Sequence, residues 1–452
     1  MGKNVGKQSV RSKGRGQSAR AVATPSRPAQ VAAILDEVLT WQSAADQSVS
    51  RYFRANKQMG SRDRAEIAAA VFDVLRHLRH YRNLAQSGPG QLTLCLAWLG
   101  LYATLEKPRE QLPTEASMHD WVAHCQRISP DTLSFAVRYS LPDWLQVEIE
   151  RLPQPESFAK ALLQSAPLDL RVNTFKSSRA NVLEQIEVLR SSQAHWQAIP
   201  TPFSETGIRI NANPPLEQWD LFKQGLIEVQ DEGSQLLARL LDPKRHEMVI
   251  DYCAGAGGKT LALGAMMNSS GRLYAFDVSA SRLSKAKPRF ARSGLSNIHP
   301  VVIRPHGDDR IRRLAGKAHR VLVDAPCTGL GTLRRNPDLK WRQTPEVLEN
   351  LCRQQQAILQ QASQCVRPGG RLVYATCSWL TSENEDQVDA FLKANPDFRL
   401  IDARELLPET LLETEKTSQV PVVDSAGMIR LRPDLHGTDA FFAAVMVRDA
   451  ST

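Results

Sequence analysis

The sequence predicts an α/β protein, with a doubly wound parallel sheet in its carboxyl-terminal half, preceded by an all-helical region and a small α+β region. Two observations carry this prediction. From residue 230 onward, apolar strand-like segments alternate with helical segments, a pattern typical of a parallel sheet. Between residues 30 and 140, apolar residues recur at helical spacing with few β-branched runs between them. Because 452 residues exceed one ordinary core, we expect several domains.

Composition and charge narrow the class of protein. Hydrophobic residues make up 42% of the chain and charged residues 23%, a normal globular balance. The formal net charge of +9 suits a polyanionic partner. The seven cysteines form no C-x-x-C pair, which argues against a disulfide framework or a zinc ribbon. Without a secretory leader pattern or an apolar run of ~20 residues, we expect a protein of the reducing cytoplasm with no membrane segment.

The first 29 residues form a basic segment. They include seven Lys and Arg residues and no acid, and Gly, Ser and Pro fill much of the rest. Such a segment buries too little apolar surface to fold by itself, so we expect residues 1–29 to be a disordered tail. Two roles remain open, a solubilising tail and an electrostatic arm that contacts RNA phosphates.

Residues 30–140 are predicted to form a helical bundle. Apolar stripes at helical spacing run through residues 33–39 and 69–78. Five basic residues then crowd the end of one predicted helix, namely Arg76, His77, Arg79, His80 and Arg82. We interpret them as a solvated helix end where cations are favourable, with an RNA contact as the alternative. Residues 141–165 are predicted to be a linker helix punctuated by prolines.

The small α+β region covers residues 166–229. Three strand-like pieces, LDLRVNT, GIRIN and LIEVQ, begin at residues 168, 207 and 226, and a helix-like stretch spans 178–189.

The region 230–452 carries the strongest pattern. Predicted strands cover residues 248–253, 272–279, 298–303, 319–327, 371–378 and 439–447. Thr344 and Pro345 are typical of a helix start, and Gly369-Gly370 is predicted to end that helix. Ser382 and Glu385 form a capping-box pattern that predicts the start of the next helix.

A glycine-rich turn, CAGAGGKT, follows the first strand of this region at residues 253–260. Glycines let the backbone approach a ligand, and a helix amino terminus offers free N–H groups. A Walker A loop is excluded because Cys253 stands where its first glycine belongs, and G-x-G-x-x-G fails because Thr260 replaces its last glycine. A nucleotide-like ligand without phosphates, such as the adenosine of S-adenosylmethionine, fits this turn better; a purely structural turn is the alternative.

Acidic residues follow the second and third predicted strands. Asp277 ends the second strand, where an acid can bond both ribose hydroxyls. Asp308 follows the third strand and is a candidate to bond the adenine amine, with Asp309 beside it as a competitor. A lone acid at a strand end is more often a turn residue, but two after successive strands favour a ligand.

Two cysteines are predicted to meet at the carboxyl edge of the sheet. The fourth strand ends at Asp324 and is followed by Cys327, and the fifth carries Cys377 at its end. Because neighbouring strands lie ~4.8 Å apart, both thiols can face one substrate. The stretch after Cys327 contains Arg334, Arg335, Asn336 and Lys340, which either bind a backbone phosphate or form an ordinary solvated loop.

These motifs together resemble the RsmB/Sun/Nop family of RNA cytosine-5 methyltransferases over most of residues 165–448. The combination of DAPCTG at 324–329 with ATCS at 375–378 is very specific for that family. Through SRDRAEIAAAVFDVLRH at 61–77, the helical region is similar to the NusB-type RNA-binding domain of the bacterial 16S ribosomal RNA member. The family's turn usually reads CAAPGGK, whereas Ala256 stands here in place of the proline.

The resemblance implies a class I methyltransferase fold, which is Rossmann-like, and S-adenosylmethionine as cofactor. It also implies an RNA partner, with no metal and no membrane, and we expect a monomer. Cys377 would be the nucleophile, and Cys327 would assist release of the methylated RNA. The implied cofactor-binding residues are Cys253, Ala254, Gly255, Ala256, Gly257, Gly258, Lys259, Asp277, Arg282, Asp308 and Asp324.

The chemistry gives an independent reason for two thiols. Cytosine C5 is a poor nucleophile, and a thiolate that adds at C6 makes it an enamine-like carbon able to attack a sulfonium methyl group. The C5 proton then leaves, and elimination frees the enzyme. Lys259 is a candidate source of the positive charge that favours the thiolate, and Asp324 is a candidate hydrogen-bond partner for cytosine N3 or N4. The target base must leave its stack to reach such a pocket.

Several alternatives stay open. DNA cytosine-5 methyltransferases use a Pro-Cys nucleophile, which would nominate Cys327 instead of Cys377. A non-catalytic RNA-binding assembly factor could retain this fold, although both cysteines are present. A small-molecule methyltransferase would have little use for the large basic amino-terminal half. The target RNA is expected to be 16S ribosomal RNA, with transfer RNA as the alternative.

Overall fold

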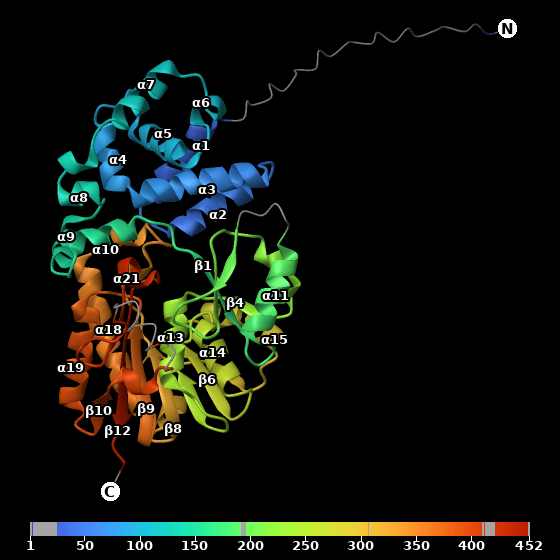
Figure 1. The fold of residues 1–452 in the computed structure, drawn as a ribbon, viewed down its shortest axis with the longest axis vertical. Coiled ribbons are helices and arrows are strands. Elements are labelled where there is room, and N and C mark those ends of the chain that lie inside the picture. Colours follow the sequence, from blue (N-terminus) through green and yellow to red (C-terminus); the bar gives the residue numbers. More distant parts are fainter. Residues whose placement is uncertain are drawn as a thin grey trace.

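A computed structural model describes residues 25–190, 196–305, 307–408 and 421–450, together with Gly2 and Leu411. In Figure 1 the helical region lies above a large sheet flanked by helices, and the small sheet lies beside them. Most of the predicted tail lies outside the described residues. Its last three residues correct the prediction: helix α1 begins at Arg27, and the Arg27 guanidinium pairs with Asp63 and Glu66 at 2.9 Å each.

The amino-terminal region is helical, as predicted. Helix α5 is apolar on nearly every side and lies at its centre against α1 and α3, which is why Trp98 is fully buried. The elements of this region are α1 (Arg27–Val38), α2 (Ala45–Ala55), α3 (Ser61–Arg76), α4 (Leu78–Ala85), α5 (Leu92–Thr104), α6 (Pro108–Gln111), α7 (Ala116–Cys125), η1 (Pro130–Thr132), α8 (Phe135–Arg138), α9 (Asp143–Glu150) and α10 (Pro155–Leu162).

The predicted basic helix end at 76–82 is a break between two helices. Helix α3 ends at Arg76 and α4 begins at Leu78. Arg79 turns toward the linker, where its Nη1 donates to the carbonyl oxygen of Leu141 at 2.7 Å and pairs with Asp143 at 2.6 Å. The Arg79 side chain therefore joins the helical bundle to helix α9.

The α+β region is an antiparallel sheet in the order β2-β3-β1-β4. The three predicted strands are present, and β2 was missed. Ser178 caps the predicted helix by accepting from the backbone N–H of Asn181. The elements are β1 (Leu168–Val172), α11 (Arg179–Leu189), β2 (Ala198–Pro200), β3 (Gly207–Ile210), η2 (Leu216–Gln218), α12 (Asp220–Lys223) and β4 (Ile227–Val229).

The large sheet has the order β10-β12-β9-β8-β5-β6-β7, with β11 paired to β12. Strands β5 to β9 are parallel, and β12 runs antiparallel between β9 and β10. Its strands are β5 (Met248–Asp251), β6 (Arg272–Asp277), β7 (Ile298–Val302), β8 (Ala318–Asp324), β9 (Val366–Thr376), β10 (Phe398–Ile401), β11 (Ile429–Leu431) and β12 (Phe441–Arg448). All six predicted strands are present, and the short strands β10 and β11 were not predicted.

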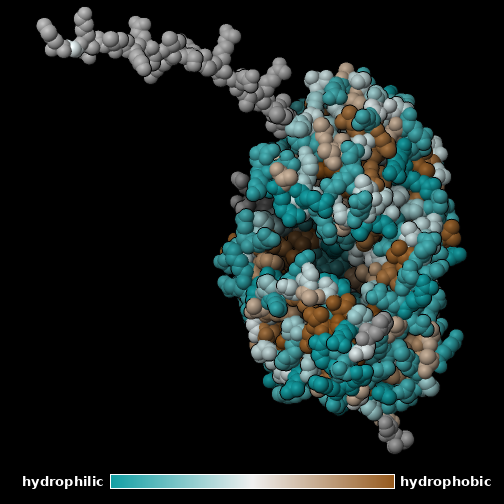
Figure 2. Space-filling model, turned by 180° about the vertical axis from the view of Figure 1, so that it is seen from behind, coloured by the Kyte–Doolittle hydropathy of each residue, from teal (hydrophilic) through white to brown (hydrophobic). Residues whose placement is uncertain are grey.

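Helices and turns complete this region. They are α13 (Glu232–Leu241), α14 (Gly258–Met266), α15 (Ala280–Ser293), α16 (Asp309–Arg313), η3 (Leu330–Thr332), α17 (Leu339–Arg342), α18 (Pro345–Ser363), η4 (Thr381–Glu383), α19 (Glu385–Ala394), η5 (Ala403–Leu406) and α21 (Pro433–His436). Figure 2 shows the opposite face of the molecule, which is hollowed between the helical region and the large-sheet region.

Two predicted helix boundaries in this region are wrong. Helix α18 ends at Ser363, and Gly369-Gly370 lies inside β9. There the register with β8 jumps from Ala318↔Val366 to Arg320↔Arg371, so the glycines belong to a bulge, and Gly369 has a φ of +71°. Ser382 does not cap α19 because it lies in the turn η4, and Asn384 precedes the helix instead.

Candidate functional site

The carboxyl edge of the large sheet brings the two predicted cysteines together. Strands β8 and β9 are parallel neighbours, with Asp324 opposite Ala375 in register. Cys327 follows β8 and Cys377 follows β9, and their Sγ atoms lie 3.2 Å apart. The two thiols are thus within contact although fifty residues separate them in the chain.

Both thiols open onto a cavity of about 780 Å³, a volume within the roughly 300–1,000 Å³ typical of small-molecule sites. Most of the predicted site residues line it. These are Cys253, Ala254, Gly255, Ala256, Gly258, Lys259, Asp277, Arg282, Asp324, Cys327 and Cys377. Gly257 and Asp308 do not line it.

The turn between β5 and α14 forms one wall of the cavity. Gly255 has a φ of +56°, and a Cβ there would meet nothing closer than 4.0 Å, so the backbone faces open space. Gly257 has a φ of +80°, and a Cβ there would lie 2.4 Å from the ring of Phe290. The first glycine leaves room for a ligand, whereas the second lets the turn pack on helix α15.

Asp277 lies at the carboxyl end of β6 and supports the same turn. Its carboxylate accepts from the backbone N–H groups of Gly255 at 2.8 Å and Ser279 at 2.7 Å, and it pairs with Arg282 at 3.0 Å. The carboxylate is almost fully buried yet borders the cavity. It therefore fixes the turn and retains acceptor capacity toward a ligand.

Lys259 and Asp324 form an ion pair beside the thiols. The Lys259 Nζ lies 2.7 Å from Asp324 Oδ2, and the lysine side chain is 10% exposed. Burial opposes the lysine charge, but the charge and hydrogen bond of Asp324 outweigh it, with a smaller contribution from Cys377, so the pKa of Lys259 is raised. The site thus holds a fixed positive charge near Cys377.

The Cys327 thiol forms a hydrogen bond with the Cys377 thiol. Its hydrogen bond with Cys377 and its burial raise the pKa of Cys327 well above the ordinary range. Burial likewise raises the pKa of Cys253 well above that range. Neither of these groups is a ready thiolate, since a thiolate requires a lowered pKa or a neighbouring cation.

Asp308 does not line the cavity. Its carboxylate caps helix α16 by accepting from the backbone N–H of Arg310 at 2.9 Å, and it also pairs with the Arg310 guanidinium at 2.6 Å. That guanidinium lowers the pKa of Asp308 far below its usual range. Asp309, the competitor, pairs with Arg312 and does not line the cavity either. The residues after β7 that do line it are Ile303, Arg304 and Pro305.

The basic stretch after Cys327 does not form a solvated loop, because three of its side chains contact other parts of the protein. Arg334 is buried and donates to the carbonyl oxygens of Gly437 and Thr438, both at 3.1 Å. Arg335 pairs with Asp231 at 2.9 Å and with Asp439 at 2.7 Å.

Lys340 is the third basic residue that was misjudged. It is only 3% exposed and donates to the carbonyl oxygen of Arg76 at 2.7 Å. Three of the four predicted residues therefore make structural contacts with distant segments of the chain, and Asn336 is exposed.

Sequence reasoning missed one wall of the cavity. The sequence predicts helix α18, but it does not predict that one face of this helix lines the cavity. Its lining residues recur at helical spacing, namely Arg353, Gln354, Ala357, Ile358 and Gln361. The available signal was this mostly polar stripe along the helix, but a stripe alone does not show which surface it faces.

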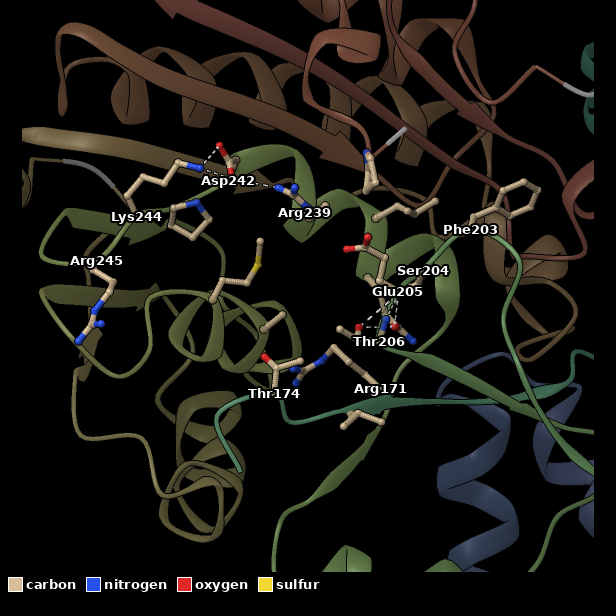
Figure 3. A pocket seen from close by; sticks show the side chains of 17 residues that line it. Arg171, Thr174, Phe203, Ser204, Glu205, Thr206, Arg239, Asp242, Lys244 and Arg245 are labelled. Carbon is tan, nitrogen blue, oxygen red and sulfur yellow. Dashed lines mark hydrogen bonds and ion pairs between the residues drawn. The ribbon is translucent and has the colours of Figure 1, made fainter. Parts of the chain in front are cut away.

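A second cavity, of about 410 Å³, lies between the small sheet and helices α13 and α14. Figure 3 shows Arg171 and Thr174 at one side, with Arg239, Asp242 and Lys244 across from them. Arg239 and Lys244 both pair with Asp242. None of the predicted site residues lines this cavity, so we place the candidate site at the larger one.

The larger cavity fits an adenosine-type ligand such as S-adenosylmethionine. An acid stands at the end of β6, the backbone of Gly255 faces open space, and apolar side chains such as Ile303 and Ile358 offer surfaces for a base. Within the described ranges, no group of three or more His, Cys, Asp or Glu side chains is arranged to hold a metal ion. No helix in that part of the chain is long and apolar enough to cross a bilayer.

Known proteins resemble this chain in sequence and in fold. The family model of the 16S rRNA methyltransferase RsmB/F matches residues 238–447. A probable ribosomal RNA small subunit methyltransferase B of Synechocystis sp. is 34% identical over 70% of this chain and 69% of that protein. One from Bacillus subtilis is 28% identical over 85% of this chain and 78% of its own. A methyltransferase homolog from Pyrococcus horikoshii, known from its crystal structure, matches 71% of this chain and 100% of its own with a TM-score of 0.57 and 27% identity.

Proposed function

The chain belongs to the RsmB/F family of 16S rRNA methyltransferases, and from this premise we propose that it methylates carbon 5 of a cytosine in RNA through a covalent adduct with Cys377. Its fold is the class I methyltransferase fold that the sequence predicts, and its cofactor is S-adenosylmethionine. The observation that carries the proposal is the contact of two thiols, 3.2 Å apart, at the mouth of the cofactor cavity.

The residues of the turn and of β6 would hold the cofactor. Asp277 would accept from the ribose hydroxyls, and the backbone from Cys253 to Lys259 would lie along the ligand, with Arg282 beside Asp277. Ile303 and Arg304 replace Asp308 in our proposal as neighbours of the base. When bound, S-adenosylmethionine supplies an electrophilic methyl group on a sulfonium centre, and this is the group that cytosine C5 accepts.

The two cysteines would have different roles. The thiolate of Cys377 adds to C6 of the cytosine and makes C5 nucleophilic. Cys327 is proposed as the partner rather than the nucleophile because the family to which the chain belongs nominates Cys377, the cysteine that follows β9. After methylation the C5 proton must pass to a base before elimination can release Cys377. With Cys377 bonded to C6, the neighbouring Cys327 would act as a thiolate, accept this proton and so assist release.

Lys259 and Asp324 would prepare the base and the nucleophile. The ammonium of Lys259 supplies a positive charge near the Cys377 sulfur. Asp324 borders the cavity and is 32% exposed, so one face of its carboxylate remains available to hydrogen-bond cytosine N4 or protonated N3. Such a bond would stabilise the N3-protonated cytosine, whose positive charge favours addition of the thiolate at C6.

The substrate is proposed to be 16S ribosomal RNA, because the matching family model carries that description and the named relatives are ribosomal RNA small subunit methyltransferases. Transfer RNA remains the second candidate. The net charge of +9 suits either polyanion.

The test is to identify the product base. Purified 16S ribosomal RNA from cells that lack the enzyme is incubated with protein and S-adenosylmethionine, digested to nucleosides and analysed by mass spectrometry and bisulfite sequencing. We expect 5-methylcytidine at one position with the wild-type protein and none with Cys377→Ala. Methylation at another atom, or of transfer RNA alone, would contradict the proposal.

A further inference from the structure

Two adjacent buried residues, Glu383 and Asn384, lie behind the cysteines at the end of the turn η4. Neither borders the cofactor cavity, and their exposures are 0% and 1%. A buried carboxylate is costly unless its oxygens are hydrogen-bonded, so its contacts need a structural reason. Those contacts reach both cysteine-bearing segments.

Glu383 holds the segment that carries Cys327. Its Oε1 accepts from the backbone N–H of Thr328 at 2.8 Å, and its Oε2 accepts from the Thr328 hydroxyl at 2.6 Å. Oε1 also accepts from Gln355 Nε2 at 2.9 Å, and the same Nε2 donates to the carbonyl oxygen of Pro326 at 2.9 Å. The residues on both sides of Cys327 are therefore tied to this one carboxylate.

Asn384 holds the segment that carries Cys377 in a similar way. Its Oδ1 accepts from the hydroxyl of Thr376 at 2.6 Å, and its Nδ2 donates to the carbonyl oxygen of Ser378 at 3.1 Å. These are the residues immediately before and after the cysteine. Thr376 and Ser378 are both fully or nearly fully buried, so water does not compete for these bonds.

We propose that the dipeptide Glu383-Asn384 is the positioning element of the active site, holding Cys327 and Cys377 at the separation that their shared reaction requires. One residue binds each cysteine-bearing segment, and the two are joined by a single peptide bond. The turn is itself fixed, since the Tyr374 hydroxyl donates to the carbonyl oxygen of Glu383 at 2.6 Å. This inference rests on the proposed two-cysteine chemistry.

The expected consequence follows from the sensitivity of catalysis to geometry. A misplacement of about 1 Å between reacting groups can cost about 100-fold in rate. Glu383→Ala removes three acceptor bonds and Asn384→Ala removes both of its bonds, so either variant should let the thiols separate. Neither residue touches the cofactor cavity, so substrate and cofactor binding should persist.

The test uses the full-length protein and two measurements. The first is the rate at which diamide converts the two thiols to a disulfide, detected by peptide mapping; two electrons and two protons pass to the diamide N=N bond as the S–S bond forms. The second is steady-state methylation. We expect Glu383→Ala and Asn384→Ala to slow disulfide formation at least tenfold and to lower kcat about 100-fold, with KM for RNA changed less than about twofold.

Controls separate positioning from a general loss of structure. Glu385→Gln changes the neighbouring acid, which pairs with Arg430, and should leave both rates unchanged. Glu383→Gln keeps one acceptor oxygen and should restore most of both rates. If an alanine variant does not fold, the same two rates are measured for Asn384→Asp. This variant keeps the acceptor for the Thr376 hydroxyl and loses the bond to the Ser378 carbonyl oxygen, so both rates should still fall.

A wild-type rate of disulfide formation in any folded variant that lacks these bonds would overturn the inference. The disulfide measurement requires no methylation. It therefore still reports the geometry if the proposed role of Cys377 is wrong, and the two failures can be told apart.

Discussion

Asp251, at the end of β5, is a buried acid directly behind the cofactor turn. Burial raises the pKa of Asp251 to about 7, against the opposing hydrogen bond from the Thr260 hydroxyl at 2.6 Å. The unfolded chain loses this proton near pH 3.8, whereas the folded chain keeps it to about pH 7. Between these values the folded state binds more protons, so the free energy of unfolding falls as pH rises.

Replacing this acid should remove that pH dependence. Asp251→Asn keeps an acceptor for Thr260 and cannot ionise. Relative to wild type, we expect its free energy of unfolding to increase progressively from pH 4 to pH 7, by at most about 4 kcal/mol at 1.36 kcal/mol per pKa unit. Urea unfolding without cofactor at a series of pH values measures this. The exposed acid variant Asp389→Asn serves as control, and a pH-independent difference for Asp251→Asn would contradict the account.

For single residues, the sequence indicates which side chains lie near the cavity more reliably than it indicates the contacts of each side chain. Asp277 and Asp324 lie at strand ends and border the cavity, as their positions after apolar strands suggested. Asp308 has the same sequence signature and instead caps a helix. An acid after a strand can bind a ligand or cap the next helix. At Asp308, the direction that the chain takes after β7 decides between these two roles.

Among the elements, the turn between β5 and α14 has the tightest conformational requirement. Gly257 has a φ of +80°, and its missing Cβ leaves room for Phe290 of helix α15. Gly257→Ala should cost about 2–5 kcal/mol of stability, from a left-handed conformation and from overpacking against the ring. Urea denaturation measures the loss.

The next residue of the turn provides a matched control. Gly258 begins α14, and a Cβ there would meet nothing closer than 3.8 Å. Gly258→Ala should therefore leave stability unchanged or raise it by about 0.4–1 kcal/mol, since alanine restricts the unfolded chain. Equal losses in the two variants would contradict the assigned role of Gly257.

The elements themselves were largely predictable, and their exceptions have local causes. The alternation of strand-like and helical segments predicts β5 to β9. Thr344 and Pro345 predict the start of α18. The pair Gly369-Gly370 suggested a helix end because a bulge and a C-cap both use a glycine with positive φ. Helix α18 was found, but its cavity-facing side was not, because the partner of a helix face is decided by packing.

In the whole molecule, the segment after Cys327 joins the carboxyl edge of the large sheet to the helical region. Trp341 Nε1 donates to the carbonyl oxygen of Leu75 at 2.8 Å, and Lys340 Nζ donates to that of Arg76 at 2.7 Å. These carbonyls belong to the last turn of α3, which has no helical partner for them. The contact thus caps α3 and anchors the cysteine segment together.

Loss of the contact between Trp341 and α3 should increase local unfolding of both the segment after Cys327 and the end of α3. Trp341→Ala removes a ring that packs on the helical core, and we expect a loss near the low end of the roughly 3–5 kcal/mol of buried tryptophans. Hydrogen exchange followed by mass spectrometry should show faster exchange in residues 327–342 and in the last turn of α3. Trp196→Phe, in the small sheet, is the control. Unchanged exchange in 327–342 would show that the anchor is dispensable.

This coupling was beyond sequence reasoning. From the sequence, the basic residues at 334–340 are expected to contact RNA or solvent, because charged residues are rarely buried. Their burial requires carbonyls and acids contributed by segments about 100 to 260 residues away, and the sequence pattern does not pair such distant groups. By contrast, the fold class, the order of the regions along the chain and the contact of the two cysteines can be predicted from the sequence.

Trapping the enzyme–RNA adduct distinguishes the proposed roles of the two thiols. Cys327→Ala and Cys377→Ala are each incubated with substrate RNA and S-adenosylmethionine, and denaturing gels reveal protein covalently bound to RNA. We predict that Cys327→Ala accumulates the adduct, because Cys377 attacks and release is impaired, and that Cys377→Ala forms none. An adduct in Cys377→Ala with none in Cys327→Ala would reverse the assignment.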